Sequence, residues 1–487
     1  MLSKLVLFKL FLTLAILAPA SAAPANDNKP CPPANANSNA QAAPWCRTTS
    51  TIITPTSTSL ASSVPEPTTS QTPPTPPASG ERKRCAIQAL GGDADDAPAI
   101  NRAFEECSQG GVVAFEYGVR YNAYNPVSAL KLNGTKVEFY GNVHLPEDIP
   151  TVQAIVADPK VYDGYWFRFK GEGLEWVGTK DINAGWIDSH GQAWWDANPA
   201  GQGGLPNRPH LLRFDIKKST IKNLKSEKPI GWNTRIVADD LYIEGTVVNA
   251  HSESGSFPFN TDGLGLSGTN ILAVDSKIDN GDDCFAITTP SRNITMRKAT
   301  CGGPGTHGLS IGSLGKNQAQ VNTVRDITFE DITMIDALYG ARFKSWVGGQ
   351  GITENIKYHD IRLYNVTYPI AVTQTYVDQN NPGGDRVNNG SVILKNFSFK
   401  DWVGDINSFQ PGDKSCISDP CWYEQDLPEF TGSQGIFFSC ANEGSCQGFE
   451  TENLRIYGQN GVPAEFLCKN VHAASNPNLG FTCADNL

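Results

Sequence analysis

The sequence lacks the features that typify nucleic-acid-binding and membrane-embedded proteins. It carries 39 lysines and arginines against 50 aspartates and glutamates, which gives a formal charge of −11. An acidic surface disfavours nucleic acid and anionic membranes as partners. Apart from a short run at residues 10–17, no segment is apolar enough to suggest a bilayer span. We therefore expect an exported, soluble protein in which local cations hold any anionic ligand.

The twelve cysteines lack the paired C-x2-C spacing of structural zinc sites. In an exported chain they are better explained as disulfides, although spacing alone does not fix their connectivity. Close neighbours suggest five local pairs, with Cys31 and Cys46 left over: Cys85–Cys107, Cys284–Cys301, Cys416–Cys421, Cys440–Cys446 and Cys468–Cys483.

Composition divides the chain into three parts. Residues 1–22 have the pattern of a secretory signal peptide, with Lys4 and Lys9, an apolar core and a small-residue cleavage site ending at Ala22. Residues 23–83 are rich in Ser, Thr and Pro and predict an O-glycosylated linker without a core. The folded domain is expected over residues 84–487. Five sequons fit an extracellular glycoprotein: Asn133, Asn293, Asn365, Asn389 and Asn396.

Residues 93–107 contain the only convincing helix pattern, with Asp95 or Asp96 as its cap. Short strands rich in Val, Ile and Thr follow, separated by Gly, Asn and Asp. An Asn or Asp before an aliphatic residue recurs at positions 223, 240, 270, 293, 326 and 355, at intervals of 17, 30, 23, 33 and 29 residues. Such irregular coils favour an all-β solenoid, a parallel β-helix, over a sandwich or an evenly repeating propeller. The Asn positions could stack as side-chain ladders.

Four polar residues are spaced at about one coil of such a solenoid. Asp262 precedes the pair Asp282 and Asp283, and His307 follows it. Neighbouring coils lie about 4.8 Å apart, so these groups could converge on one patch. Alone, two adjacent aspartates indicate a solvated turn or Ca²⁺ ligands, and a lone histidine is usually structural. Together they form a cluster able to protonate a leaving group and to activate a water.

Arg342 and Lys344 lie two coils further on and point to the same side of a predicted strand, with Phe343 opposite. Such a cation pair can clamp a sugar carboxylate, since Arg binds it bidentately and Lys binds it as a point charge. The alternative is that both cations form salt bridges with the three aspartates.

The motifs Asn-Thr-Asp-Gly, Gly-Asp-Asp-Cys, His-Gly-Leu-Ser-Ile-Gly-Ser and Arg-Phe-Lys, in this order, resemble the polygalacturonase family, glycoside hydrolase family 28. The resemblance covers roughly residues 84–487. It implies a right-handed parallel β-helix and inverting hydrolysis of α-1,4-galacturonosyl bonds in pectin. We also expect a monomer that needs no cofactor or metal. By this resemblance Asp282 is the general acid, and Asp262 and Asp283 activate the water. His307 tunes the acid. The substrate-binding residues are Asn260, Arg342, Lys344 and Tyr376.

The chain departs from the family pattern at two points. Phe343 replaces the usual Ile between the two cations, and Leu264-Gly265 follows the first motif where an aromatic residue and Asp are more common. The second change removes an acid near the site. Because Phe343 is expected to point inward, only the second departure bears on substrate preference.

Two candidate inserts, residues 185–209 and 405–438, would close one end of the groove and favour exo action. Trp194 and Trp195 in the first insert could stack on sugars or could simply pack. The primary hypothesis is therefore a secreted exo-polygalacturonase. Close alternatives are an exo-enzyme acting on rhamnogalacturonan and a xylogalacturonan hydrolase. Other classes are a Ca²⁺-dependent pectate lyase, which would need a basic catalyst, and a non-catalytic pectin-binding β-helix protein.

Overall fold

The computed structural model describes residues 82–487 except residues 304, 377–385, 410–411, 414, 418–420, 425–426, 428–431 and 484–486. The expected signal peptide, the Cys31 and Cys46 pair and all but the last two residues of the expected linker lie outside the described residues. The first strand begins at Arg84, where the sequence places the start of the folded domain. No helix of the described part is long and apolar enough to cross a membrane.

Alternating apolar and polar residues build the strands. In β12 (Thr234–Glu244), Ile236, Ala238, Leu241 and Ile243 are buried, and the alternation changes phase at Asp240. Asp240 has a φ of 58°, so the chain turns a corner there without leaving the strand pairing. Each coil thus presents one row of side chains to a continuous apolar interior.

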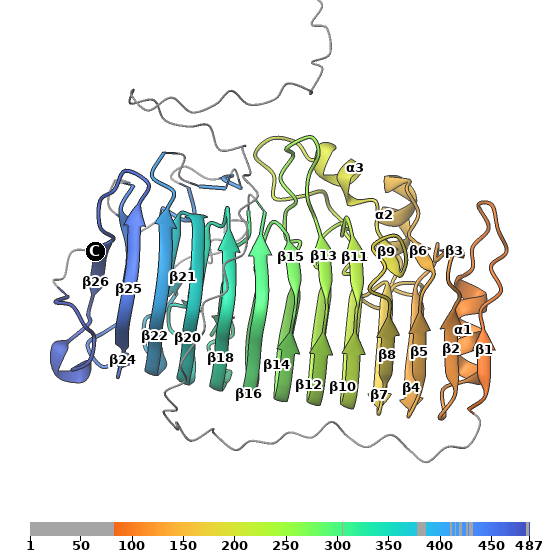
Figure 1. Cartoon of the computed structure of the whole chain (residues 1–487), viewed down its shortest axis with the longest axis horizontal. Helices are drawn as coiled ribbons and strands as arrows, with labels where there is room; N and C mark the ends of the chain where they lie inside the picture. Colours follow the sequence, from red (N-terminus) through yellow and green to blue (C-terminus); the bar gives the residue numbers. More distant parts are fainter. Residues whose placement is uncertain are drawn as a thin grey trace, which may run out of the picture. The chain divides into compact units, whose positions relative to one another are not determined.

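The strands pair in parallel with their neighbours one coil away and form a single right-handed parallel β-helix (Figure 1), which confirms the expected fold class. They are β1 (Arg84–Ala86), β2 (Val112–Phe115), β3 (Arg120–Asn122), β4 (Val127–Asn133), β5 (Lys136–Phe139), β6 (Asn142–His144), β7 (Phe167–Glu172), β8 (Glu175–Gly178), β9 (Trp186–Asp188), β10 (Leu212–Lys222), β11 (Lys225–Glu227), β12 (Thr234–Glu244), β13 (Val247–Asn249), β14 (Leu264–Val274), β15 (Lys277–Asp279), β16 (Phe285–Gly302), β17 (Leu309–Leu314), β18 (Val321–Ile335), β19 (Tyr339–Trp346), β20 (Gln350–Val366), β21 (Tyr368–Tyr376), β22 (Val392–Ile406), β23 (Gln434–Ser439), β24 (Cys446–Gln447), β25 (Glu450–Gly458) and β26 (Glu465–Lys469).

The predicted N-terminal helix is confirmed but shorter than expected. It is α1 (Ala97–Glu106), and the side chain of Asp95 accepts a hydrogen bond from the first helical N–H at 3.0 Å. The carboxylate of Asp96 instead binds the backbone N–H groups of Leu90 and Asn122. Two further helices, α2 (Ile149–Ala157) and α3 (Gly191–Asp196), lie in connections between strands. The sequence does not reveal them because α3 has only six residues and α2 is apolar almost throughout, so neither shows an amphipathic pattern.

The Asn ladders exist, with one error in register. Asn270 donates to Asp240 at 2.8 Å, and Asn293 donates to Asn270 at 2.8 Å. In a further run, Asn355 donates to Asp326 and Asn396 donates to Asn355. Position 223 belongs to a different corner, because the strand pairing sets Lys218, not Asn223, opposite Asp240. The assignment of Asn223 to this ladder was therefore wrong, and the interval of 17 residues does not correspond to one coil.

All five expected disulfides form in the structure. Three of the five sequons occupy ladder positions: the side-chain amides of Asn293, Asn365 and Asn396 each donate to a neighbouring coil. Asn133, Asn293, Asn389 and Asn396 are exposed, and Asn365 is half-buried. Glycosylation stays a prediction at all five positions.

Candidate functional site

Strand register brings the four predicted catalytic residues onto neighbouring coils. Leu264 of β14, Phe285 of β16 and Leu309 of β17 pair with one another in sequence. Asp262, Asp283 and His307 each stand two residues before one of these paired positions. Main-chain hydrogen bonds continue the pairing through this segment, from Gly263 N–H to the Asp283 carbonyl and from His307 N–H to the Asp282 carbonyl. The convergence expected from coil spacing therefore occurs.

His307 lies between two carboxylates. Its Nδ1 is 3.0 Å from Oδ1 of Asp282, and its Nε2 is 2.9 Å from Oδ2 of Asp413. Asp413 is 4% exposed, and its other oxygen accepts from the backbone N–H of Ser415. A ring with a carboxylate at both nitrogens donates from both and is held as an imidazolium.

The pKa values of Asp282 and Asp262 are shifted in opposite directions. Burial alone would lower the pKa of His307, but Asp282 and Asp413 together raise it to about 9. Burial would raise the pKa of Asp282, yet His307, Lys344 and Arg342 hold it well below its usual range. Asp282 also accepts from Asn260 Nδ2 at 3.1 Å. Crowding by the neighbouring carboxylates would by itself raise the pKa of Asp282, but in the unliganded site the positive charge of the imidazolium outweighs them.

Asp262 behaves in the opposite way. Burial raises its pKa well above the ordinary value, and the negative charges of Asp282 and Asp283 raise it further. Its Oδ1 is buried without a hydrogen-bond partner among the described residues. Asp262 is thus the carboxyl of this cluster that most readily keeps a proton.

Asp283 is fixed by three side chains. Lys344 Nζ donates to Oδ2 at 2.7 Å, Ser310 Oγ donates to Oδ1, and Arg342 Nη1 lies 3.7 Å from Oδ1. Arg342 and Lys344 project from one side of β19 while Phe343 packs in the core, as the sequence predicts. In the structure both cations also form salt bridges to Asp283, one of the three aspartates named in the alternative.

Three aromatic rings surround Arg342. Its guanidinium carbon lies 4.5 Å from the ring centre of Tyr339, 4.9 Å from Trp422 and 5.7 Å from Tyr376. Rings on several sides hold the planar guanidinium in one orientation. The predicted substrate-contacting Tyr376 is therefore beside both cations, since Lys344 Nζ is 5.8 Å from its ring centre.

Both inserts reach this site. Arg208, in residues 185–209, donates to Oδ1 of Asn260 at 2.7 Å and to the Phe259 carbonyl at 2.6 Å. Burial lowers the pKa of Arg208 to about 10, against the opposing pull of Asp282 and Asp262. The second insert, residues 405–438, supplies Asp413 and Trp422.

The stacking role considered for Trp194 and Trp195 is wrong. Their exposures are 1% and 4%, and both belong to the hydrophobic core. Trp232 lies closer to the chemistry, because its ring is 5.2 Å from the Arg208 guanidinium and is 37% exposed. Sequence reasoning missed Trp232, Arg208, Asp413 and Trp422. All four lie in irregular segments without a repeating pattern, and only the insert boundaries pointed toward three of them.

The chain matches a family model and several curated proteins. The family model of Glycosyl hydrolases family 28 matches residues 118–421. A probable exopolygalacturonase C from Aspergillus terreus is 44% identical over 404 residues, covering 83% of this chain and 92% of that protein. Its counterpart from Aspergillus niger is 45% identical over 81% of this chain and 89% of its own length. An exopolygalacturonase from Rhizopus delemar is 33% identical over 75% of this chain and 87% of that protein.

Solved structures agree in fold. An endo-xylogalacturonan hydrolase from Aspergillus tubingensis superimposes with a TM-score of 0.59 at 20% identity, over 83% of this chain and 99% of that one. A polygalacturonase from Erwinia carotovora gives 0.58 at 17% identity, over 82% and 99%. These two likenesses concern the β-helix alone. The family model and the curated relatives go further, and by them the chain belongs to glycosyl hydrolases family 28.

Proposed function

We propose that the chain is an exo-polygalacturonase that hydrolyses α-1,4-galacturonosyl bonds of pectin with inversion. The relatives named exopolygalacturonase, matched over most of both chains, support this activity. The observation that supports it most is that Arg342 and Lys344 are ion-paired with Asp283 of the acid cluster. Both inserts also contact this site, through Arg208 and through Trp422. The likeness to a xylogalacturonan hydrolase concerns fold alone and does not favour that substrate. Membership of a hydrolase family argues against the pectate lyase, and the intact acids argue against a binding-only protein.

Asp282 is the proposed general acid, and it works as a pair with His307. In the unliganded site the pair's proton resides on the imidazole, 3.0 Å from Oδ1 of Asp282. When a sugar displaces water, the proton passes through Asp282 to the glycosidic oxygen, and the leaving chain departs with it. Asp413 keeps the imidazole charged until that moment. General acids of this kind contribute about 10²–10⁴-fold to the rate.

Asp262 and Asp283 are the proposed water-activating pair. Asp283 is held in place by Lys344 and Ser310 and orients the water. Oδ1 of Asp262, which has no hydrogen-bond partner among the described residues, accepts the proton of the water. A raised pKa suits Asp262 for this step, because a base is most effective with a pKa near the working pH. Attack opposite the leaving group inverts the anomeric carbon.

The substrate carboxylate is proposed to bind Arg342 and Lys344, with Tyr376 and Asn260 alongside. The two cations already neutralise Asp283, so a uronate completes a site whose charges are close to balance. Secretion, glycosylation at the exposed sequons and a monomeric state are proposed with this activity. They fit the resemblance to fungal exopolygalacturonases.

Replacing Asp282 with Asn tests the assignment. Reducing-end release from de-esterified polygalacturonate should fall at least about 100-fold in Asp282→Asn, with substrate binding retained. Asp331→Asn is the matched control, because Asp331 is a surface acid paired with Arg362 outside the site. Proton NMR of the first product should show the β-anomer. Unchanged hydrolysis in Asp282→Asn, or an α-anomer, would refute the proposed roles.

A further inference from the structure

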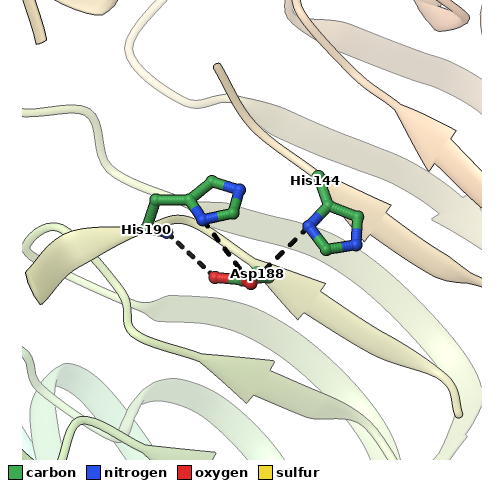
Figure 2. A group of neighbouring side chains, drawn as sticks. All are labelled: His144, Asp188 and His190. Atoms are coloured by element: carbon green, nitrogen blue, oxygen red, sulfur yellow. Dashed lines mark hydrogen bonds and ion pairs between the residues drawn. The ribbon is translucent and has the colours of Figure 1, made fainter. Parts of the chain in front are cut away.

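Two imidazoles and a carboxylate meet at the start of the first insert, on coils N-terminal to the catalytic site. They are His144 at the end of β6, Asp188 at the end of β9, and His190 just before α3 (Figure 2). Strand pairing sets His144 opposite Asp188. The rings lie nearly parallel, with centres 5.4 Å apart and planes 21° apart. Nothing in the proposed hydrolysis uses these three residues.

The spacing of the donor atoms is that of metal ligands. Nδ1 of His144 is 3.5 Å and Nδ1 of His190 is 3.6 Å from the same oxygen, Oδ2 of Asp188. These distances are longer than hydrogen bonds to a carboxylate, and Nδ1 of His144 is buried without a hydrogen-bond partner among the described residues. Tetrahedral ligands with bonds of about 2.0 Å have edges of about 3.3 Å. All three donor atoms lie within 4.8 Å of one another.

The backbone prepares Asp188 for this role. Oδ1 accepts the backbone N–H of His190 at 3.0 Å, which fixes the carboxylate and turns Oδ2 toward both rings. His190 has a φ of 57°, a left-handed conformation that few side chains adopt, and this sharp turn brings its ring back over Asp188. A carboxylate oriented by a second interaction is a recurring feature of metal sites.

The donor set selects the kind of ion. Two imidazole nitrogens and one carboxylate oxygen suit Zn²⁺ and its neighbours, whereas Ca²⁺ and Mg²⁺ prefer oxygen alone. Three protein ligands leave a fourth position for water. Side-chain exposures of 14%, 22% and 20% for His144, Asp188 and His190 leave a path for an ion while excluding most solvent.

We propose that His144, Asp188 and His190 bind one zinc-class divalent ion that fastens β6 to β9 and to the first turn of the insert. The same insert ends near Arg208, which holds Asn260 of the catalytic site. The ion is therefore a structural anchor for the insert that contacts the acid cluster through Arg208 and Asn260. It takes no part in hydrolysis, which the resemblance implies is metal-free.

An ordinary His–Asp pair elsewhere in the chain gives the contrast. His251 Nδ1 is 3.7 Å from Oδ2 of Asp279, but the two side chains are 59% and 40% exposed. No second imidazole joins that pair within the described part of the chain. Burial and the second ring distinguish the proposed site from a surface ion pair.

The test uses tag-free full-length protein, stripped with EDTA and exchanged into metal-free buffer. Calorimetric titration with ZnCl2, checked by elemental analysis after gel filtration, should give one bound Zn²⁺ per chain. His144→Gln and Asp188→Asn should each lose this binding. His251→Gln, the matched control, and Asp282→Asn should both keep it, the latter because the catalytic cluster is not the site. Circular dichroism of each metal-free variant checks its fold.

Thermal unfolding gives the second readout. Because an ion that binds only the folded chain stabilises it, Zn²⁺ should raise the melting temperature of the wild type and of His251→Gln. It should leave the melting temperatures of His144→Gln and Asp188→Asn unchanged. The proposal is overturned if wild-type protein binds no Zn²⁺, or if folded His144→Gln and Asp188→Asn still bind one equivalent.

Discussion

Protonation in the catalytic site depends on a residue outside the family motifs. Asp413 lies 2.9 Å from Nε2 of His307 and, with Asp282, raises the pKa of the imidazole to about 9. The motif residues alone would leave a buried histidine with only one carboxylate. At the scale of single residues, Asp413 raises the pKa of His307, and in the proposed mechanism it is a positioning residue.

Asp413→Asn removes this charge and keeps the shape of the side chain. The pKa of His307 should fall, so the alkaline limb of the pH–rate profile should move to lower pH, while the acid limb, set by ionisation of Asp262, should stay in place. Full pH profiles of kcat/KM measure both limbs. Glu443→Gln, which changes the exposed carboxylate beside His472, is the matched control. An alkaline limb that does not move would contradict the role of Asp413.

Arg342→Lys keeps the positive charge but loses the planar fork that the three rings hold. The KM for polygalacturonate should rise at least about tenfold, since a bidentate contact to the uronate is lost. The preference for de-esterified over methyl-esterified substrate should shrink in parallel. Arg362→Lys, at a surface pair with Asp331, should leave both quantities unchanged. An Arg342→Lys enzyme with a wild-type KM would exclude this carboxylate contact.

At the scale of elements, residues from both inserts contact the proposed site. Trp422 of the second insert packs 5.1 Å from the His307 ring and 4.9 Å from the Arg342 guanidinium. The Cys416–Cys421 disulfide closes the short loop just before it. Arg208 of the first insert ties the opposite wall to Asn260. These contacts are the structural basis for expecting release of sugars from a chain end.

Trp422→Ala should open this end of the site. The expected outcome is a lower kcat/KM together with larger products early in the reaction, because the wall that stops the chain is gone and Arg342 loses one of its rings. Product chromatography at low conversion measures the change. Tyr457→Ala removes a half-exposed aromatic far along the β-helix and should leave the products unchanged. Monomer as the sole early product of Trp422→Ala would refute a closing role for Trp422.

The elements also show why sequence reasoning succeeded where it did. The order of Asp262, Asp282, Asp283 and His307 could be placed in space because parallel coils stack with fixed pairing. Asn223 was placed in the wrong corner because Asn and Asp mark more than one turn of each coil. The partners Asp413 and Arg208 could not be predicted, since irregular inserts carry no period from which direction follows. The protonation states of His307 and Asp282 could not be predicted either, because they depend on contacts of about 3 Å around His307.

At the scale of the whole molecule, ladders of Asn and Asp follow the corners of the β-helix. Asn355 donates to Asp326 at 2.9 Å, accepts from Asn396 at 3.0 Å and has a φ of 58°. Asn tolerates this left-handed conformation better than most residues. The same side chain thus supplies the turn and the link between coils.

Asn355→Ala should destabilise the fold by about 2 kcal/mol, the combined size of an exposed hydrogen-bond pair and of left-handed strain. Asn355→Gly loses the hydrogen bonds but not the permitted backbone conformation, so its melting temperature should fall less. Scanning calorimetry of both variants separates the two causes. Equal losses in Ala and Gly would mean that strain contributes nothing at this corner.

In the proposed activity, the site releases single galacturonate units from one end of the pectin chain. Its most direct measurement is a time course on de-esterified polygalacturonate, with products separated by size and viscosity followed in the same sample. Exo hydrolysis should release monogalacturonate from the first minutes, with slow loss of viscosity. Rapid thinning with a spread of oligomers would contradict it and would mean that the inserts leave the groove open.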